Sequence, residues 1–233
     1  MATATTTYLI RFRSSSTLTL ASSIIIDQCD FKLTASTGDA NGIYLDGATV
    51  SGISEIKVMQ NSVLNNGGNR AYPFYASSST LSASRITFVD STVIATGVTR
   101  AFGMYLLNHT ITSASTINFT NTAVTATTSS TGNSFGLLYE STSWAGNSEI
   151  KVLLNSSVVA VSVEGAAQGI SSYSSPNTRI LVDENSTVQG TTNESDAIGV
   201  YLWSSDNSTV ELRGNSSVVA VSVEGYAQGV YSH

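Results

Sequence analysis

Acidic and basic residues that recur at a fixed distance are the first candidates for chemistry in this sequence. Glu55 and Arg85 lie 30 residues apart, and so do Glu149 and Arg179. Carboxylates and bases that converge in a cleft can act as general acids and bases. The residues around these four are Thr, Asn and Leu, however, and no spacing gathers several Asp, Lys and Arg residues at one place. We therefore interpret the pairs as exposed neighbours, each worth less than about 1 kcal/mol, and expect no enzymatic activity.

Other reactive side chains are scarce. The histidines are His109 and His233, and Cys29 is the single cysteine. One cysteine cannot form an internal disulfide, and neither a Cys-x-x-Cys motif nor a His/Cys cluster is present to bind zinc. We expect no cofactor and no metal site.

The composition excludes several classes of partner. The 233 residues carry a net charge of -6, 11% charged residues, and 39 Ser and 29 Thr. Ten scattered Lys and Arg provide no phosphate-binding patch, so nucleic acid is not expected as a partner. The longest apolar runs have about five residues, far below the roughly 20 that span a bilayer, so we expect no membrane insertion. Residues 1–16 lack the apolar core of a signal peptide, and the signal of an exported protein would lie outside this chain.

The sequence repeats itself. Residues 155–170 read NSSVVAVSVEGAAQGI and residues 215–230 read NSSVVAVSVEGYAQGV, with fourteen of sixteen positions identical. Residues 185–200, halfway between them, follow the same pattern with other residues. The structural period is therefore 30 residues, and the chain is a tandem array.

Each period contains three short runs. The first is Ile-x-(Val/Phe/Leu), and it begins at Ile56, Ile86, Ile117, Ile150, Ile180 and Val210. The second follows after seven or eight residues, at Val63, Val93, Val124, Val158, Val188 and Val218. The third is typically Ala-x-Gly-aliphatic-Tyr, and its Gly slot is occupied by Gly42, Pro73, Gly103, Gly136, Gly169, Gly199 and Gly229. These runs alternate with a period of two and are rich in Val, Ile, Thr and Ser, which predicts β-strands.

Three strands in every 30 residues predict one fold. We expect an all-β chain that forms a single parallel β-helix (β-solenoid) with three strands per coil and six to seven coils, stacked at about 4.8 Å per coil. The general rule for parallel crossovers predicts a right-handed solenoid. The solenoid should span residues 18–233. Residues 1–17 should form an irregular segment that serves as a cap or a docking strand.

Parallel stacking turns each position of the repeat into a column of side chains. The turn between the first and second strands holds a column predicted to be a structural ladder, whose members tolerate the left-handed backbone of a tight turn, satisfy its N–H groups and bond to one another. They are Asn61, Asp90, Asn121, Asn155, Asn185 and Asn215. The alternative is N-glycosylation, because seven asparagines match N-x-(Ser/Thr): Asn108, Asn118, Asn155, Asn185, Asn193, Asn207 and Asn215. Chance alone predicts about five such matches at this composition.

The third strand suggests an interaction surface. Strict alternation would place the residue after the Gly slot inside the solenoid and turn the Gly slot outward. It would also turn outward a column of tyrosines, Tyr44, Tyr75, Tyr105, Tyr201 and Tyr231. This strip could pack against another protein or a sugar surface, or the rings could simply cover their own strand. Pro73 lacks an N–H, so the hydrogen-bond ladder should be interrupted there.

One more apolar column should lie in the connection from the third strand to the next first strand and anchor it to the core. Its members are Val50, Leu81, Ile111, Trp144, Tyr173 and Trp203.

The pattern resembles the passenger domains of bacterial autotransporter adhesins and related haemagglutinin-like surface proteins. The resemblance covers residues 18–233 and rests on the parallel β-helix, the acidic Ser/Thr/Asn-rich composition and the recurring NS-x-V-x-A and A-x-G-(I/V)-Y units. It implies an extracellular or cell-surface location and an adhesive or scaffolding role, with surface molecules of host or neighbouring cells as partners, glycans among them. It supplies no catalytic residue.

We therefore expect a non-enzymatic structural or adhesive solenoid of a microbial surface. The main alternative is a β-helix that binds or cleaves polysaccharides, like a phage tailspike or a pectin lyase, which would need a groove of clustered acids. An ice-binding solenoid would need a regular outward Thr-x-Thr array. The last coil ends directly after its third strand, so we expect either that the chain is an excerpt of a longer surface protein or that copies of it associate head to tail into filaments.

Overall fold

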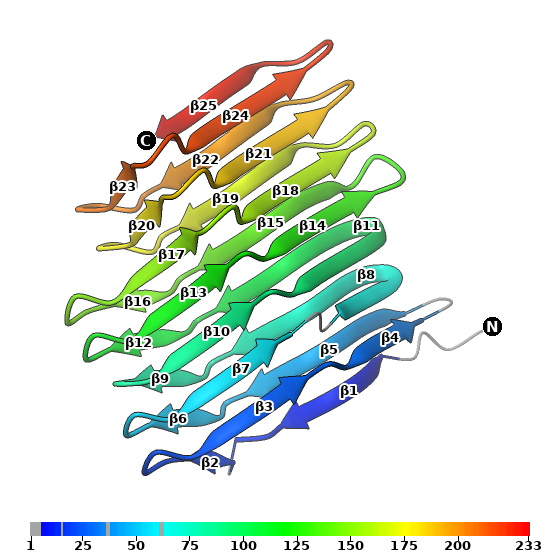
Figure 1. The fold of residues 1–233 in the computed structure, drawn as a ribbon. Coiled ribbons are helices and arrows are strands. Elements are labelled where there is room, and N and C mark those ends of the chain that lie inside the picture. Colours follow the sequence, from blue (N-terminus) through cyan, green and yellow to red (C-terminus); the bar gives the residue numbers. More distant parts are fainter. Residues whose placement is uncertain (1–5, 15, 36–37, 61–62) are drawn as a thin grey trace.

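The computed structural model describes residues 6–14, 16–35, 38–60 and 63–233. These residues form a β-solenoid of about seven turns with about 31 residues per turn, and they contain no helix (Figure 1). The all-β solenoid expected from the repeat is therefore confirmed. Its handedness stays a prediction.

Three parallel sheets run along the stack of coils. The first-strand sheet consists of β3 (Ser23–Asp27), β7 (Glu55–Met59), β10 (Arg85–Val89), β13 (Thr116–Thr120), β17 (Glu149–Leu153), β20 (Arg179–Val182) and β23 (Thr209–Leu212). A short sheet in the connections consists of β2 (Thr17–Leu18), β6 (Thr49–Ser51), β9 (Thr80–Ser82), β12 (Thr110–Thr112) and β16 (Ser143–Trp144).

The large sheet holds the second and third strands of every coil. Its second strands are β4 (Asp30–Thr34), β14 (Ala123–Thr128), β18 (Ser157–Ser162), β21 (Thr187–Thr192) and β24 (Ser217–Ser222). Its third strands are β1 (Thr7–Phe12), β5 (Asp39–Asp46), β15 (Asn133–Glu140), β19 (Ala167–Tyr173), β22 (Ala197–Trp203) and β25 (Ala227–Ser232). In two coils the second and third strands join into one long strand, β8 (Val63–Ser77) and β11 (Thr92–Leu107).

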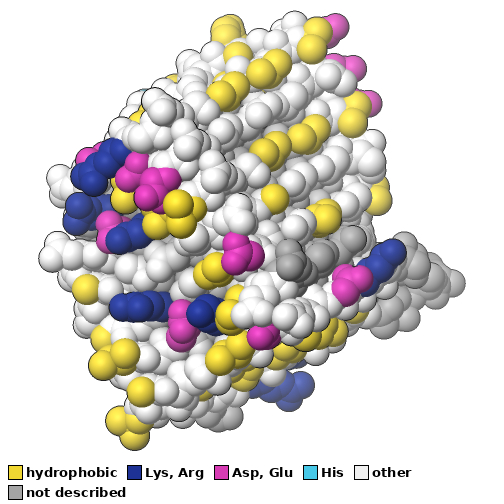
Figure 2. Space-filling model, viewed as in Figure 1, with side chains coloured by type: hydrophobic (Ala, Val, Ile, Leu, Met, Phe, Trp, Pro, Cys, Tyr) yellow, Lys and Arg dark blue, Asp and Glu magenta, His cyan; other side chains and the backbone are white. Residues whose placement is uncertain are grey.

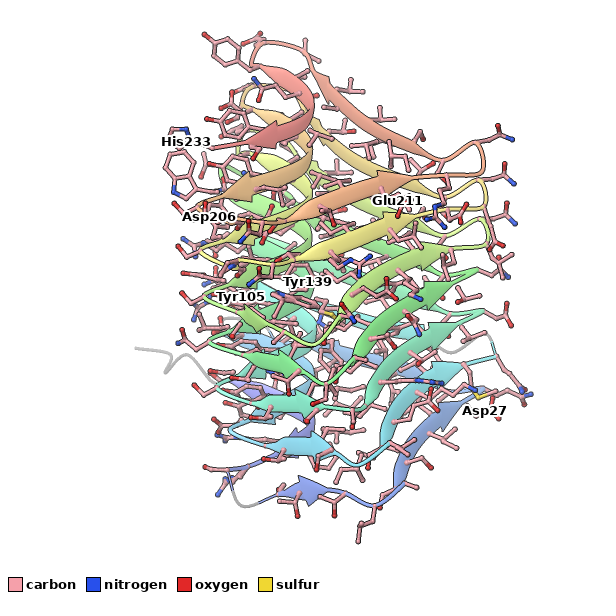
Figure 3. The ribbon with its side chains drawn as sticks, turned by 90° about the vertical axis from the view of Figure 1, so that its left-hand side faces the viewer. Asp27, Tyr105, Tyr139, Asp206, Glu211 and His233 are labelled. Atoms are coloured by element: carbon pink, nitrogen blue, oxygen red, sulfur yellow. The ribbon has the colours of Figure 1, made fainter. Side chains whose placement is uncertain are left out.

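The predicted interior column of the first-strand sheet is confirmed. Each of its members pairs in register with the next, from Ile24 through Ile56, Ile86, Ile117, Ile150 and Ile180 to Val210. Five of these side chains, Ile56 to Ile180, are at most 2% exposed. Side chains of other columns repeat in the same way from coil to coil (Figure 3). The core is thus continuous along the solenoid.

The column in the connections is confirmed only in part. Val50, Leu81, Ile111 and Trp144 are buried and stack in the short sheet. Tyr173 and Trp203 do not continue this column, because Tyr173 pairs with Glu140 at the end of the third strand and Trp203 pairs with Tyr173. The later coils have shorter connections, which leave no room for a strand of the short sheet.

The parallel pairing of strands also begins earlier in the chain than the sequence indicated. The N-terminal segment was expected to be irregular, but β1 pairs in parallel with β5, with Tyr8 beside Asn41 and Ile10 beside Ile43. β2 pairs with β6 as well. The described part of residues 1–17 therefore contributes two strands to the solenoid.

Each coil consists of a wide lobe and a narrow lobe. The wide lobe holds the large apolar side chains. In the narrow lobe, the second half of the second strand packs directly on the first half of the third, and small residues fill the space: Ala71, Ala95, Ala101 and Ala126 form a separate buried cluster. A Cβ on Gly190 would lie 2.4 Å from the carbonyl oxygen of Ala167. The two strands can approach this closely only because their facing side chains are small.

The Gly slot lies where the two lobes meet, and its predicted outward orientation is wrong. A Cβ on Gly136 would lie 2.5 Å from Cγ1 of the buried Val158 and 2.4 Å from the carbonyl oxygen of Gly169 in the next coil. Gly103, Gly169 and Gly199 have equivalent contacts. Two successive residues, the glycine and the apolar residue after it, therefore face the interior, and the strand bends at this point.

This bend also explains how Pro73 fits. In each pair of neighbouring third strands, the paired register passes over the Gly slot. Ala71 pairs with Ala101, for example, and the next pair is Phe74 with Met104. The interruption expected at Pro73 is thus present, but it is common to all these coils. Proline occupies a slot that has no partner in the register of paired residues, and so its missing N–H is tolerated there.

Buried Ser and Thr side chains hold the corners. Between the first and second strands, the backbone N–H of Thr122 donates to Oγ of Ser156 in the next coil, Ser156 N–H to Ser186 Oγ, and Ser186 N–H to Ser216 Oγ. Ser156 Oγ donates to the carbonyl oxygen of Leu153. Equivalent bonds occur at the other two corners of the wide lobe, such as Ser115 N–H to Ser148 Oγ and Thr142 N–H to Ser175 Oγ. Backbone groups that the turns leave unpaired are satisfied in this way.

One member of a corner column differs. His109 lies below Thr142 in the column of Ser79, Thr142 and Ser175, and it is 1% exposed. Neither ring nitrogen has a hydrogen-bond partner, and the same holds for the Tyr139 hydroxyl and the Trp144 Nε1, which lie in the adjacent coil of the core. Burial lowers the pKa of His109 to about 3.

We predict that Gly136→Ala destabilises the protein by about 2–3 kcal/mol, because the new Cβ overlaps a backbone oxygen and a packed valine. The matched control is Gly67→Ala, since the nearest atom to a Cβ there is 3.9 Å away. Urea unfolding followed by circular dichroism measures both. Equal midpoints for the two variants would show that the bend does not need glycine.

We also predict an acid-sensitive core. The unfolded chain protonates His109 near pH 6.5, whereas the folded chain does so only near pH 3. The free energy of unfolding therefore falls by about 1.4 kcal/mol for each pH unit between pH 6.5 and pH 3. His109→Leu should remove about 2 kcal/mol of the loss between pH 7 and pH 5. Thr142→Val, at the next position of the same buried column, removes no titratable group, and as the control it should leave the pH dependence of unfolding unchanged.

Candidate interaction surfaces

The bend at the Gly slot brings two outward columns of the third strand together. One column precedes the slot and contains Tyr72, Phe102 and Phe135, and the other follows it by two residues and contains the predicted tyrosines. Within one strand, the rings of Tyr72 and Tyr75 lie 5.2 Å apart, and so the two columns converge on the same outer face. Side chains three residues apart would point to opposite faces of a straight strand.

These columns form an aromatic strip along the N-terminal coils. It consists of Tyr8, Tyr44, Tyr72, Tyr75, Phe102, Tyr105 and Phe135. Neighbouring rings of successive coils are 4.7–5.4 Å apart with interplanar angles of 5–8°. The strip ends at Leu138 and Ser171, and stacking resumes between Tyr201 and Tyr231, 5.2 Å apart.

The geometry decides what the aromatic strip can do. The ring spacing matches the spacing between coils, so the ring planes lie across the solenoid axis and each face is covered by the next ring. Tyr44, Tyr75 and Tyr105 are half-buried, whereas Tyr72, Phe102 and Phe135 are at most 7% exposed. A sugar ring stacks on an aromatic face, and these faces are already occupied. The predicted tyrosines thus lie in two groups, Tyr44, Tyr75 and Tyr105 in the strip and Tyr201 with Tyr231 beyond it, and their use as an interaction surface stays a prediction.

Polar groups fix the rings further. The Tyr105 hydroxyl donates to Glu140 Oε2 at 2.6 Å, and the Arg11 guanidinium, paired with Asp46, lies 4.7 Å from the centre of the Tyr8 ring. Burial raises the pKa of Tyr72 and of Tyr44 to about 12. Burial and the bond to Glu140 raise the pKa of Tyr105. The strip is thus an uncharged, internally bonded layer at neutral pH.

A second surface was missed in the sequence. The outward residues of β14, β18, β21 and β24 form three columns with no charged member, here called the neutral face: Ala123, Thr125, Thr127, Ser157, Val159, Val161, Thr187, Gln189, Thr191, Ser217, Val219 and Val221. In Figure 2 charged side chains gather over the first-strand sheet, while rows of hydrophobic side chains lie among uncharged ones over these strands. The sequence does contain a signal for this face, because the outward residues of these second runs are all uncharged.

The asparagine column has the turn conformation expected of it, and one side-chain bond of the expected ladder is present. Asp90, Asn121, Asn155, Asn185 and Asn215 are exposed turn residues with φ between 46° and 62°, a conformation that Asn and Asp tolerate well. Among the described members, the side-chain bond is that from Asn121 Nδ2 to Asp90 Oδ1, at 2.7 Å. Asn61 lies outside the described residues. The continuous ladder is formed instead by the Ser and Thr side chains one position later.

The N-x-(Ser/Thr) sites differ in exposure. Asn108, Asn155, Asn185, Asn193, Asn207 and Asn215 are exposed, whereas Asn118 is half-buried and its Nδ2 donates to Thr116 Oγ1. N-glycosylation stays the alternative interpretation of these asparagines.

The predicted acid–base neighbours are placed as expected but do not form ion pairs with each other. Glu55 pairs in register with Arg85, and Glu149 lies beside Arg179 at the start of β17 and β20. The described ion pair of Glu149 is with Lys151 on its own strand, at 2.7 Å. In the part of the chain that the structure describes, no group of three or more His, Cys, Asp and Glu side chains could hold a metal ion.

Comparison with known proteins identifies no family for the chain. No family model, no curated protein and no solved structure matches the chain. The described residues include no helix that is long and apolar enough to cross a membrane. The chain is a β-solenoid repeat protein, and the likeness to autotransporter adhesins stays a prediction.

We predict that the aromatic strip makes the fold sensitive to alkali. Tyrosines ionise near pH 10 in the unfolded chain and Tyr72 near pH 12 in the folded one, so stability is complete below about pH 10 and is lost as the pH rises toward 12. Tyr72→Phe should shift the alkaline unfolding midpoint, read by circular dichroism, to higher pH. Phe102→Leu, at the ring stacked on Tyr72, removes no titratable group and is the control, which should not move the midpoint in the same direction. A midpoint unchanged in both variants would contradict the assignment.

Proposed function

We propose that the chain is a non-enzymatic structural and adhesive solenoid of an extracellular or cell-surface protein, which binds surface molecules of host or neighbouring cells. The observation that carries this proposal is the neutral face. Its residues lie on four adjacent, in-register strands, and so they form a broad and regular surface. Contact with such a face requires no desolvation of charged groups.

The rest of the molecule supports a scaffold better than a catalyst. The acidic and basic side chains of the first-strand sheet lie on an outer surface, and His109 is buried and neutral. The coils share one register, which gives a rigid support for a repeated surface. Head-to-tail association of copies stays a prediction from the sequence.

Adhesion of protein-coated beads to layers of microbial and host cells tests the proposal. Val161→Lys and Thr191→Lys place a cation on the neutral face and should lower bead retention by about tenfold, because the cation must be desolvated in the contact. Leu181→Lys, on the charged side of the solenoid, is the matched control and should retain adhesion.

Two results would overturn the proposal. One is equal retention of the two neutral-face variants and the wild type. The other is release of reducing ends from polysaccharides incubated with the purified chain, which would show an enzyme.

A further inference from the structure

The short sheet ends inside the stack of coils, and its end forms a ledge. β16 pairs with β12 on one side and with no described strand on the other, although two further coils follow it. The connection from Thr142 to Ile150 is three residues longer than the one from Ser175 to Ile180 in the next coil, while the two connections begin and end side by side. Residues 143–147, here called the ledge, therefore extend past the coil that follows them.

A pocket of about 400 Å³ lies on the ledge. It is lined by residues 144–148, by Asn177 and Arg179 in the next coil, and by Asn207 and Thr209 in the coil after that. Asn177 and Arg179 are exposed although their coil has a neighbour on both sides. The pocket thus results from the change in connection length within the stack, and its volume is in the range found for small-molecule sites.

Three asparagines occupy one position of the turn in successive coils, namely Asn147, Asn177 and Asn207. They have φ between 56° and 61°. In three earlier coils this position holds Ile53, Ala83 and Ala114, with φ between 49° and 64°, so the left-handed conformation does not by itself require Asn. The three side-chain amides form no hydrogen bond with the described residues. Each is free to donate and to accept.

Arg179 gives the pocket a positive charge. Its side chain forms no ion pair with the described residues, because Glu149, the acid beside it in the preceding coil, pairs with Lys151 at 2.7 Å. A guanidinium is planar, and its N–H groups match the two oxygens of a carboxylate. The pocket therefore combines one site for a carboxylate with several groups that bond to hydroxyls.

This set of groups favours a sugar over a peptide. An extended peptide binds by adding a strand to the edge of a sheet, and the open edge of β16 comprises only Ser143–Trp144. Amides in successive coils are spaced at about 4.8 Å, which suits the neighbouring hydroxyls of a sugar ring. The Trp144 side chain is 2% exposed, so it offers no ring face, and polar contacts must provide the affinity.

We propose that the pocket on the ledge binds a uronic acid unit of an acidic polysaccharide. Arg179 binds the carboxylate in a bidentate manner, and the amides of Asn147, Asn177 and Asn207 bond to the hydroxyls. The neutral face lies on the second strands of the large sheet, whereas this pocket lies at the turn before the first strands. The site is therefore independent of the adhesive surface proposed above.

Titration of the full chain with methyl glycosides of glucuronic, galacturonic and mannuronic acid, followed by NMR, tests the proposal. Each uronide is compared with its neutral sugar, which lacks only the carboxylate. At least one uronide should bind with a dissociation constant on the order of 1 mM, and its neutral counterpart at least about tenfold more weakly.

Variants separate the groups of the pocket. Arg179→Gln should weaken binding of the uronide at least about tenfold. Asn177→Ala, which the backbone tolerates because Ala83 has the same position and conformation, should weaken it about threefold. The matched control is Arg85→Gln, since Arg85 occupies the position of Arg179 three coils earlier, after Ala83 instead of an asparagine. This variant should bind like the wild type.

Four results would overturn the proposal. They are the absence of uronide binding at about 50 mM, equal binding of uronides and neutral sugars, binding that survives Arg179→Gln, and an equal loss in Arg85→Gln. N-acetylglutamate amide, which carries a carboxylate without sugar hydroxyls, should bind more weakly than the best uronide. If it binds as tightly, the pocket recognises acidic peptides as well as sugars, and the assignment to a uronic acid is wrong.

Discussion

The register of the backbone hydrogen bonds between coils is the constraint on which the rest of this structure depends. Because each strand pairs in parallel with its counterpart about 31 residues away, every position of the repeat is placed above its equivalent. Apolar columns then give a continuous core, and small hydroxyl side chains at the corners satisfy turn N–H groups from coil to coil. The same register spaces the tyrosine rings at their stacking distance. A side chain that does not fit in one coil therefore disturbs the packing of the coils on both sides.

Columns defined by large side chains could be predicted from the sequence. Ile56 and Ile86 recur at a fixed step with alternating neighbours, and alternation in a regular strand determines which face is buried. Alternation fails at the Gly slot, where two consecutive residues face inward, and a glycine carries no side chain whose type would reveal the bend. This failure also concealed the second aromatic column, since Tyr72 and Tyr75 share a face only on a bent strand.

Two further errors have physical causes in particular residues. β1 was not recognised because Leu9 stands where the other coils have glycine or proline, so the repeat signature was absent although Ile10 pairs with Ile43. Asn121 and its counterparts were expected to form a ladder because of their type. Their left-handed backbone conformation is present as expected, and the bonds that continue from coil to coil are made by the buried hydroxyls beside them. Neither the neutral face nor the pocket carries a recognisable motif, because each arises from positions in different coils.

The orientation of the inter-coil bonds has a mechanical consequence. Every sheet joins successive coils by bonds that run along the solenoid axis, so tension applied through the two ends of the chain loads one coil boundary at a time. Under such a load, the molecule should yield by peeling, with each event releasing about 31 residues, or about 100 Å of extended chain. A tether of this kind lengthens in equal steps and absorbs work at each step while the remaining coils stay folded.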